Sequence, residues 1–288
     1  MVFIDKTTQH SSNSKERLEV WKRAFRYQGK TLEQLYSEPN QTGGNLWDKA
    51  TSIKTILRQD LWNEQNGICC YCCKKLDEHK NGKTATRIEH FLPKGEPRNV
   101  DTFRQRVFDY DNLLLSCDGD PEGSYSTTPQ YVNGIIETKE EIALRVKVSV
   151  HTIDEYNDSI KIGKKVYYGK DHCDPHKANK IEPIIDPTKS RDCWEYFIVN
   201  EKGEISINSN IENDDVKIKV DNSIKILNLK ATILNKERKM AFDGFVSAWE
   251  IMKDVLDIQE YFTIQHGIIQ PYCFVNYHFL TNILKGNS

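Results

Sequence analysis

The chain has 288 residues, of which 38% are hydrophobic and 28% are charged, and its formal net charge at pH 7 is −2. This composition is typical of a soluble globular protein, and no run of about 18 apolar residues suggests a membrane-spanning helix. The first residues lack the basic and apolar segments of a secretory signal, so we expect a cytoplasmic protein. Its eight cysteines then favour a metal site over a disulfide framework.

Helical patterns dominate the N-terminal part of the chain. Ser14 can cap a first helix. The apolar face of that helix consists of Leu18, Trp21 and Phe25. Residues 31–34 have the spacing of a capping box, which predicts a short helix, and residues 40–44 form a predicted loop. A further helix precedes Gly67, which is expected to end it. Its apolar positions are Ile53, Ile56, Leu57 and Leu61.

The second half begins with an insertion and ends in helices. Residues 118–130 are rich in Gly, Pro, Ser and Thr and predict a loop, whereas 137–154 have a helix-like pattern. Residues 194–199 and 205–207 predict a β-hairpin. From Ser223 onward the spacing of apolar residues is helical. These residues are Ile226, Leu229, Ile233, Ala241, Phe245, Ala248, Met252 and Leu256.

Basic residues gather in two stretches despite the slightly negative net charge. Residues 159–180 are rich in lysine, and residues 83–106 are basic on balance. The lysines of the first stretch are Lys161, Lys164, Lys165, Lys170, Lys177 and Lys180. Such stretches can neutralise a phosphate backbone, although they can equally form a solvated face.

The cysteine spacing indicates a zinc site. Cys69 and Cys72, like Cys70 and Cys73, have the spacing that lets two thiolates bind one tetrahedral zinc. We favour Cys69 and Cys72 as the first pair. Cys70 and Cys73 would then point elsewhere, because neighbouring side chains diverge. Cys117 and Cys173 complete the expected set of four. Four thiolates leave no open position for water, so this zinc would be structural. A thiol redox pair is the alternative use of the same spacing.

Acidic residues and histidines lie beside these cysteines and are candidates for catalysis. His90 can act as a general base on water that attacks phosphorus. Phosphodiester cleavage also needs a divalent cation, for which Glu89 or Asp111 can supply oxygen ligands. Asn112 can bind metal weakly or orient His90. His172 and His176 can complete the ligand shell.

Taken together, these motifs resemble the HNH endonuclease (ββα-metal) family. The resemblance rests on the Cys-x-x-Cys pair, Ile-Glu-His-Phe-Leu-Pro at 88–93, Asp-Asn-Leu-Leu-Leu-Ser-Cys at 111–117 and His-Cys-x-x-x-Lys at 172–177. The segment 64–72 and the late 172–179 run are similar to PtuB-type HNH proteins. Those accompany a PtuA ATPase in Septu and some retron anti-phage systems.

The resemblance implies a role for each matching residue. His90 matches the general base, Glu89 a metal ligand and Asn112 the supporting asparagine of the family. The zinc ligands that it implies are Cys69, Cys72, Cys117 and Cys173. Many members place a second catalytic histidine directly after the last cysteine, where this chain has Asp174. The second cation ligand is therefore Asp174, His172 or His176, of which we favour His176.

We therefore expect an α+β fold with a zinc-stapled ββα-metal core surrounded by N- and C-terminal helices and a small β-hairpin. The expected regions are 1–63 (helical), 64–180 (nuclease, with an insertion at about 118–171) and 181–288 (hairpin and helices). The expected activity is phosphodiester hydrolysis with a structural Zn²⁺ and a catalytic Mg²⁺-like ion. Alternatives are a ribonuclease that acts on transfer RNA, or a zinc-stabilised binding module without activity.

The expected partners follow from the resemblance. They are a nucleic acid, with DNA favoured over RNA, and a PtuA-like ATPase. In retron systems they include a reverse transcriptase with its RNA–DNA product. No membrane partner is expected.

Overall fold

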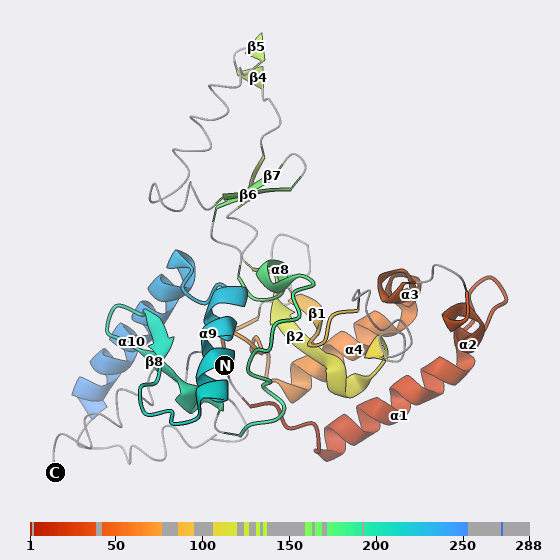
Figure 1. Cartoon of the computed structure of the whole chain (residues 1–288), viewed down its shortest axis with the longest axis horizontal. Helices are drawn as coiled ribbons and strands as arrows, with labels where there is room; N and C mark the ends of the chain where they lie inside the picture. The colour runs from red at the N-terminus through yellow and green to blue at the C-terminus, as the bar shows by residue number, and fades with distance from the viewer. Residues whose placement is uncertain are drawn as a thin grey trace.

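The protein has a mixed α+β fold with small β-sheets (Figure 1). The computed structural model describes residues 1, 3–38, 42–76, 86–94, 106–119, 124–126, 131–132, 135–136, 159–162, 165–168, 172–191, 193–252 and 272. The helix expected at 137–154 lies outside the described residues.

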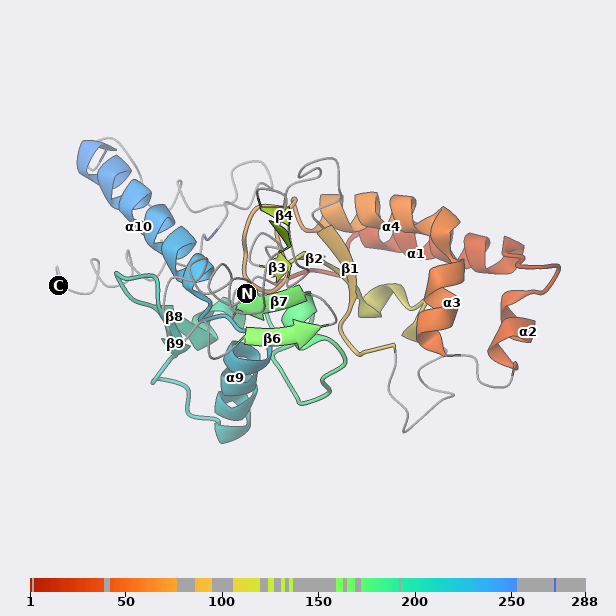
Figure 2. The same ribbon diagram turned by 90° about the horizontal axis from the view of Figure 1, so that it is seen from above.

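Helices form the N-terminal part, in agreement with the sequence. They are α1 (Gln9–Ala24), α2 (Leu32–Tyr36), α3 (Gly43–Lys49) and α4 (Thr51–Glu64). Helices α1 and α4 pack side by side, as Figures 1 and 2 both show. The capping box of α2 is confirmed: the Thr31 hydroxyl accepts from Gln34 N–H, and the Gln34 side chain accepts from Thr31 N–H. In α4, Ile53, Leu57 and Leu61 are buried, whereas Ile56 is 42% exposed.

Two predicted boundaries in this part were wrong. Helix α1 begins at Gln9 because the Thr8 side chain accepts from Ser11 N–H, which satisfies an N-terminal donor. Ser14 lies inside the helix, where its hydroxyl donates to the His10 carbonyl. Gly43 belongs to α3 and not to a loop, because Thr42 caps that helix through Asn45 N–H. A local hydroxyl decided each start.

An antiparallel two-stranded ribbon lies at the centre of the molecule. Strand β1 (Thr86–His90) pairs with β2 (Leu113–Cys117) so that Glu89 lies opposite Leu114 and His90 opposite Leu113. Every residue of β2 is buried, which explains its run of three leucines. The ribbon packs on α4. A short 3₁₀ helix, η1 (Tyr110–Asn112), leads into β2.

The buried side chain of Gln65 joins the end of α4 to β2. Its amide nitrogen donates to the carbonyls of Ile68 and Leu115, at 2.9 and 2.7 Å. Its amide oxygen accepts from Leu115 N–H at 2.7 Å. The side chain thus pairs with β2 as a neighbouring backbone would, and it leaves the cysteine-rich loop directly beside the ribbon.

Further strands lie within the insertion, and their side chains are not described. They are β3 (Ser124–Ser126), β4 (Tyr131–Val132), β5 (Ile135–Ile136), β6 (Ser159–Ile162) and β7 (Lys165–Tyr168). Strands β3, β7 and β6 form one antiparallel sheet, and β4 pairs with β5. In Figure 1, strands β4–β7 stand beyond α8, away from the central ribbon.

The C-terminal part contains a hairpin and two long helices. Its elements are α8 (Asp174–Lys177), η3 (Cys193–Tyr196), β8 (Phe197–Val199), β9 (Ile205–Ile207), α9 (Asp214–Ile226) and α10 (Thr232–Met252). The predicted hairpin is confirmed, but its first strand is shorter than expected, because residues 194–196 belong to η3. The prediction of continuous helix from Ser223 was wrong: α9 begins earlier, at the Asn213 cap, and Leu229 lies in the turn between α9 and α10.

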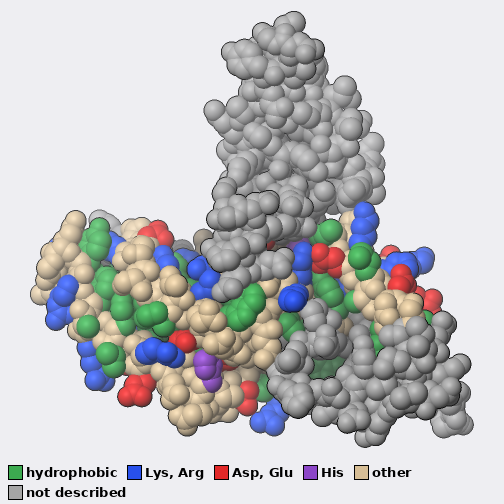
Figure 3. All heavy atoms as spheres, turned by 180° about the vertical axis from the view of Figure 1, so that it is seen from behind, with side chains coloured by type: hydrophobic (Ala, Val, Ile, Leu, Met, Phe, Trp, Pro, Cys, Tyr) green, Lys and Arg blue, Asp and Glu red, His purple; other side chains and the backbone are tan. Residues whose placement is uncertain are grey.

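The hydrophobic core is one buried cluster with members from all three expected regions. It includes Leu61, Leu114 and Leu234. In Figures 1 and 2, α1–α4 lie at one end of the molecule, α9 and α10 at the other, and the β1–β2 ribbon between them. On the face shown in Figure 3, basic side chains are interspersed with acidic and hydrophobic ones. Within the described part of the chain, no helix has the length and apolar character that crossing a membrane requires.

Candidate functional site: a cysteine cluster beside Glu89 and His90

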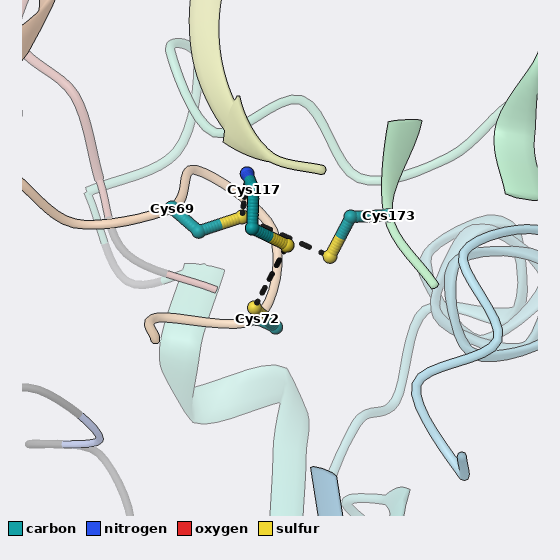
Figure 4. Close-up of side chains that lie close together, drawn as sticks. All are labelled: Cys69, Cys72, Cys117 and Cys173. Atoms are coloured by element: carbon teal, nitrogen blue, oxygen red, sulfur yellow. Dashed lines mark hydrogen bonds between the residues drawn. The ribbon is translucent and has the colours of Figure 1, made fainter. Parts of the chain in front are cut away.

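Four buried cysteine side chains converge on one point (Figure 4). The sulfur atoms of Cys69, Cys72, Cys117 and Cys173 all lie within 4.8 Å of one another. The Cys69–Cys173 and Cys72–Cys117 sulfur pairs are 3.7 and 3.9 Å apart. A tetrahedral zinc with Zn–S bonds of about 2.3 Å has sulfur–sulfur edges of about 3.8 Å. The cluster can therefore hold one structural zinc.

Separate backbone segments position these ligands. Cys69 and Cys72 come from a tight turn after α4, in which Cys73 N–H donates to the Cys69 carbonyl at 3.1 Å. Cys117 is the last residue of β2. Cys173 directly precedes α8, and its N–H donates to the Leu227 carbonyl at 2.8 Å. The cluster therefore ties the ribbon to the C-terminal part of the chain.

Hydrogen bonds within the cluster stabilise the thiolate forms of Cys69 and Cys72. Cys117 N–H donates to the Cys69 sulfur at 3.3 Å. Burial raises the pKa of Cys69, but hydrogen bonds from the neighbouring thiols, Cys117 first, bring it well below the ordinary value. The pKa of Cys72 lies at about 6, because the same kind of bonding outweighs burial. Zinc binding would displace the protons that remain on the other two thiols.

Arg238 of α10 is fully buried and lies in the electrostatic field of the same cysteines. Burial lowers the pKa of its guanidinium, whereas Tyr272, Cys72 and Cys173 raise it. Its Nη1 atom donates to the Gly203 carbonyl at 3.3 Å, while Nε and Nη2 have no hydrogen-bond partner among the described residues. Zinc with four thiolates has a net charge of −2, so a buried cation nearby lowers the cost of burying it.

Glu89 is a buried carboxylate surrounded by polar groups. Tyr71 donates a hydrogen bond to it at 2.9 Å, and the buried Lys177 ammonium lies 2.5 Å from it. Lys177 also donates to the His90 carbonyl at 3.1 Å. Burial, followed by the hydrogen bond and charge of Asp174, raises the pKa of Glu89 to about 8 against the effect of Lys177. Two carboxyl groups therefore share this site.

His90 is held in a defined state on the other face of β1. Its Nε2 atom lies 3.0 Å from the Val107 carbonyl, which can only accept, so Nε2 carries the proton. Its Nδ1 atom therefore has a lone pair, and it is buried without a hydrogen-bond partner among the described residues. Burial, followed by the charge of Lys94, lowers the pKa of His90 to about 3. The Trp47 ring contacts the imidazole in a T-shaped arrangement, with centroids 4.6 Å apart.

Asn112 braces the segment that follows β1. Its side-chain oxygen accepts from Leu92 N–H at 2.8 Å, and its amide nitrogen donates to the carbonyls of Leu92 and Arg106, at 3.1 and 3.2 Å. These bonds fix the backbone just beyond His90. The described bonds of the Asn112 side chain are therefore to backbone groups and not to the His90 ring.

The three candidates for the second cation ligand lie in different places. Asp174 is the one next to Glu89, and it also lies 3.8 Å from Arg87. The Nδ1 atom of His172 lies 3.2 Å from the Cys173 sulfur, so this ring borders the cysteine cluster. The half-buried ring of His176 is bonded through Nδ1 to the Ile226 carbonyl at 2.8 Å.

Some polar residues of this site were not assigned a role from the sequence. Lys177 was expected only as part of the basic stretch 159–180 and by its spacing from Cys173, but it is buried in an ion pair with Glu89, which is far away in the chain. Asp111, a candidate cation ligand, instead pairs with Lys15 at the surface, at 2.7 Å. Tyr71, Trp47 and Arg238 were not considered.

Comparison with known proteins adds no family assignment. No protein-family model matches the chain, and no curated protein matches it.

Proposed function

We propose that this chain is an HNH-type endonuclease that hydrolyses phosphodiester bonds in nucleic acid, with DNA as the favoured substrate. The observation that carries the proposal is the state of His90. Its Nε2–H donates to a backbone carbonyl, and its Nδ1 lone pair has no partner within the described part of the chain. The acidic residue Glu89 directly precedes it. A general base needs that tautomer and that free lone pair.

The arrangement around His90 supports the same reaction class. Strand β1, strand β2 and helix α8 occur in the order of a ββα-metal unit, and Lys177 of α8 contacts Glu89 of β1. The cysteine cluster ties together the loop before β1, the end of β2 and the start of α8. Neighbouring residues on a strand point to opposite faces, so the reacting phosphate would lie across the end of β1.

The carboxyl groups of Glu89 and Asp174, with the His90 carbonyl, would offer an oxygen donor set to a Mg²⁺-like ion, and its binding would displace the proton that the raised pKa leaves on Glu89. Such an ion, when bound, would stabilise the negative charge that develops on the phosphate. In the proposed reaction His90 Nδ1 takes the proton from the attacking water, and Asn112 holds the backbone beyond His90 in place. Asp174 replaces His176 as the favoured second ligand, because it is the one that lies against Glu89.

A second candidate function is a zinc-stabilised nucleic-acid-binding module without activity. The observation that favours it is the Lys177 ammonium, which touches both Glu89 and the His90 carbonyl, the groups that a cation would use. In the nuclease, Lys177 would move aside or act as a further positive charge at the phosphate. A cleavage assay separates these two functions.

The test is incubation of the purified, zinc-loaded chain with plasmid DNA and with total RNA, with and without added Mg²⁺ or Mn²⁺. We expect cation-dependent cleavage of DNA, and a loss of at least about 100-fold in His90→Ala. His10→Ala is the matched control, because His10 is bonded to the Asp60 carbonyl in the N-terminal part. Cleavage by His90→Ala at the wild-type rate would refute the mechanism, and cleavage of RNA alone would favour the ribonuclease.

The partner belongs to the same proposal. A nuclease in a living cell must be restrained, and we propose a PtuA-like ATPase in an anti-phage system, with a retron reverse transcriptase and its RNA–DNA product in some cases. Co-expression with an ATPase encoded by a neighbouring gene tests this. A stable complex would support the defence role, and separate elution of the two proteins would remove that support.

A further inference from the structure

A group of basic side chains lies one aromatic ring away from His90. The Trp47 ring that contacts His90 also contacts Lys54, whose Nζ atom is 5.1 Å from the ring centroid. Lys54 and Arg58 are four residues apart on α4, so they share one face of that helix. We call Lys54, Arg58 and Lys94 the basic cluster.

The members of the basic cluster are close enough to influence one another. Burial lowers the pKa of Lys54, the Asp48 carboxylate raises it, and the charges of Lys94 and Arg58 lower it further. None of the three cluster members forms an ion pair within the described residues. The Nε atom of Arg58 is buried and has no hydrogen-bond partner among the residues that the structure describes.

Close packing of the backbone keeps Lys94 in this group. A Cβ atom on Gly43 would lie 2.3 Å from the Lys94 carbonyl oxygen and 2.7 Å from a Val107 methyl carbon. Only glycine therefore lets the first turn of α3 press against the segment after β1. Because α3 leads directly into α4, the same contact fixes Lys94 relative to Lys54.

The electrostatic influence of the cluster reaches His90. The charges of Lys94 and Lys54 both lower the pKa of the imidazole. Cations that lie close together repel one another, which costs free energy. An anionic ligand bound between them attracts each cation and offsets this repulsion. A chain with a net charge of −2 has no general affinity for polyanions, so a local cluster is required to bind one.

We propose that Lys54, Arg58 and Lys94 bind the sugar–phosphate backbone of a nucleic acid on the Trp47 side of His90. The identity of the reacting phosphate rests on the proposed function, but the binding surface does not require cleavage. These residues are positioning residues: they hold the nucleic-acid strand so that a nearby phosphodiester bond lies at His90. They contact phosphates, so their contribution is independent of base sequence.

The test measures binding without cleavage. The wild-type chain is titrated against a fluorescein-labelled DNA duplex by anisotropy, without added Mg²⁺, over a range of salt concentrations. The test variant combines Lys54→Gln, Arg58→Gln and Lys94→Gln. Its matched control combines three exposed lysines of the α9–α10 part, which form no ion pair in the described chain: Lys219→Gln, Lys230→Gln and Lys236→Gln.

We expect the salt dependence to distinguish these two variants. Each lost phosphate contact lowers the slope of log K against log salt by about 0.9. The test variant should therefore lose about 2–3 units of slope and the control less than about 1, although both lose the same charge. Lys54→Gln alone should lose about 1 unit, which keeps the test valid if the triple variant misfolds.

Each outcome bears on one proposal. Equal losses in the test and control variants, or an unchanged slope in the test variant, would overturn the phosphate surface. Competition by poly-glutamate as effective as by unlabelled DNA would assign the cluster to an acidic protein instead. Binding that depends on the cluster, without cleavage under any cation, would refute the nuclease and leave the surface intact. Cleavage that the test variant retains in full would refute the surface and leave the nuclease intact.

Discussion

The cysteine cluster and the Glu89–His90 end of β1 lie on the same small ribbon, yet the buried polar atoms of these two sites differ in whether they have bonding partners. At the cysteine cluster four identical ligands meet at edges that suit one zinc ion. At the other site Glu89 pairs with Lys177 on one face of β1, while the neutral His90 ring lies on the other face, with one buried nitrogen that has no partner among the described residues. We call the four cysteines the matched set, because each can bind the same ion, and the Glu89–His90 end the unmatched site. A matched set stabilises a fold, whereas buried polar groups without partners cost stability and are typical of sites that perform chemistry.

The largest expected effect comes from removing one ligand of the matched set. Cys117→Ala removes one of the four ligands and should reduce the zinc content from about one per chain to nearly none. Structural zinc contributes roughly 10–16 kcal/mol of apparent binding free energy, and the fold loses this stabilisation together with the ion. The cooperative thermal transition should disappear with it. Elemental analysis and thermal unfolding measure both effects.

Cys70→Ala is the matched control for that prediction. Cys70 is equally buried and belongs to the competing cysteine pair, but it lies outside the group of four. It should keep its zinc. Zinc loss in Cys70→Ala together with retention in Cys117→Ala would show that the ligands are assigned to the wrong pair.

An intermediate effect is expected at Arg238. Arg238→Met removes the buried cation near the cysteine cluster and should destabilise the fold by about 3–5 kcal/mol, with a zinc affinity lower by about 10–100-fold. Chemical denaturation and competition with a chelator measure the two quantities. The neighbouring exposed Lys239, which pairs with Asp243, provides Lys239→Met as control. Unchanged zinc affinity in Arg238→Met would separate this arginine from the metal site.

The smallest effect is expected from the unmatched site and depends on pH. The pKa of folded His90, about 3, lies below its ordinary 6.5, so the unfolded chain takes up this proton first as the pH falls. The stabilising contribution is complete above pH 6.5 and decreases toward pH 3, by about 1.4 kcal/mol per unit. Between pH 6.5 and 5 the loss is about 2 kcal/mol.

Denaturation of wild type and His90→Phe across that pH range isolates this contribution, because acid effects on the cysteines are common to both. The variant should lose less stability than wild type as the pH falls. Parallel curves would mean that His90 titrates normally in the folded chain.

The sequence alone determined the parts that depend on local spacing. The cysteine pair with Cys117 and Cys173, the capping box at Thr31 and the hairpin at 197–207 were all predicted and are found. Each of these follows from geometry within a few residues, or from the shared need of four thiolates for one metal. The helix starts failed where two hydroxyls competed, as at Thr8 and Ser14.

The tertiary structure decided what each of the polar residues faces. Asp174, His172 and His176 are almost adjacent in sequence, yet they contact Glu89, the cysteine cluster and α9 respectively. Asp174 and His176 lie on the short α8, whereas His172 precedes it, so the three side chains point in different directions and no spacing rule ranks them. Arg238 and Lys177 were hidden for a related reason. A buried charged side chain is stabilised by partners that are distant in the chain, so its role can be recognised only once the chain is packed.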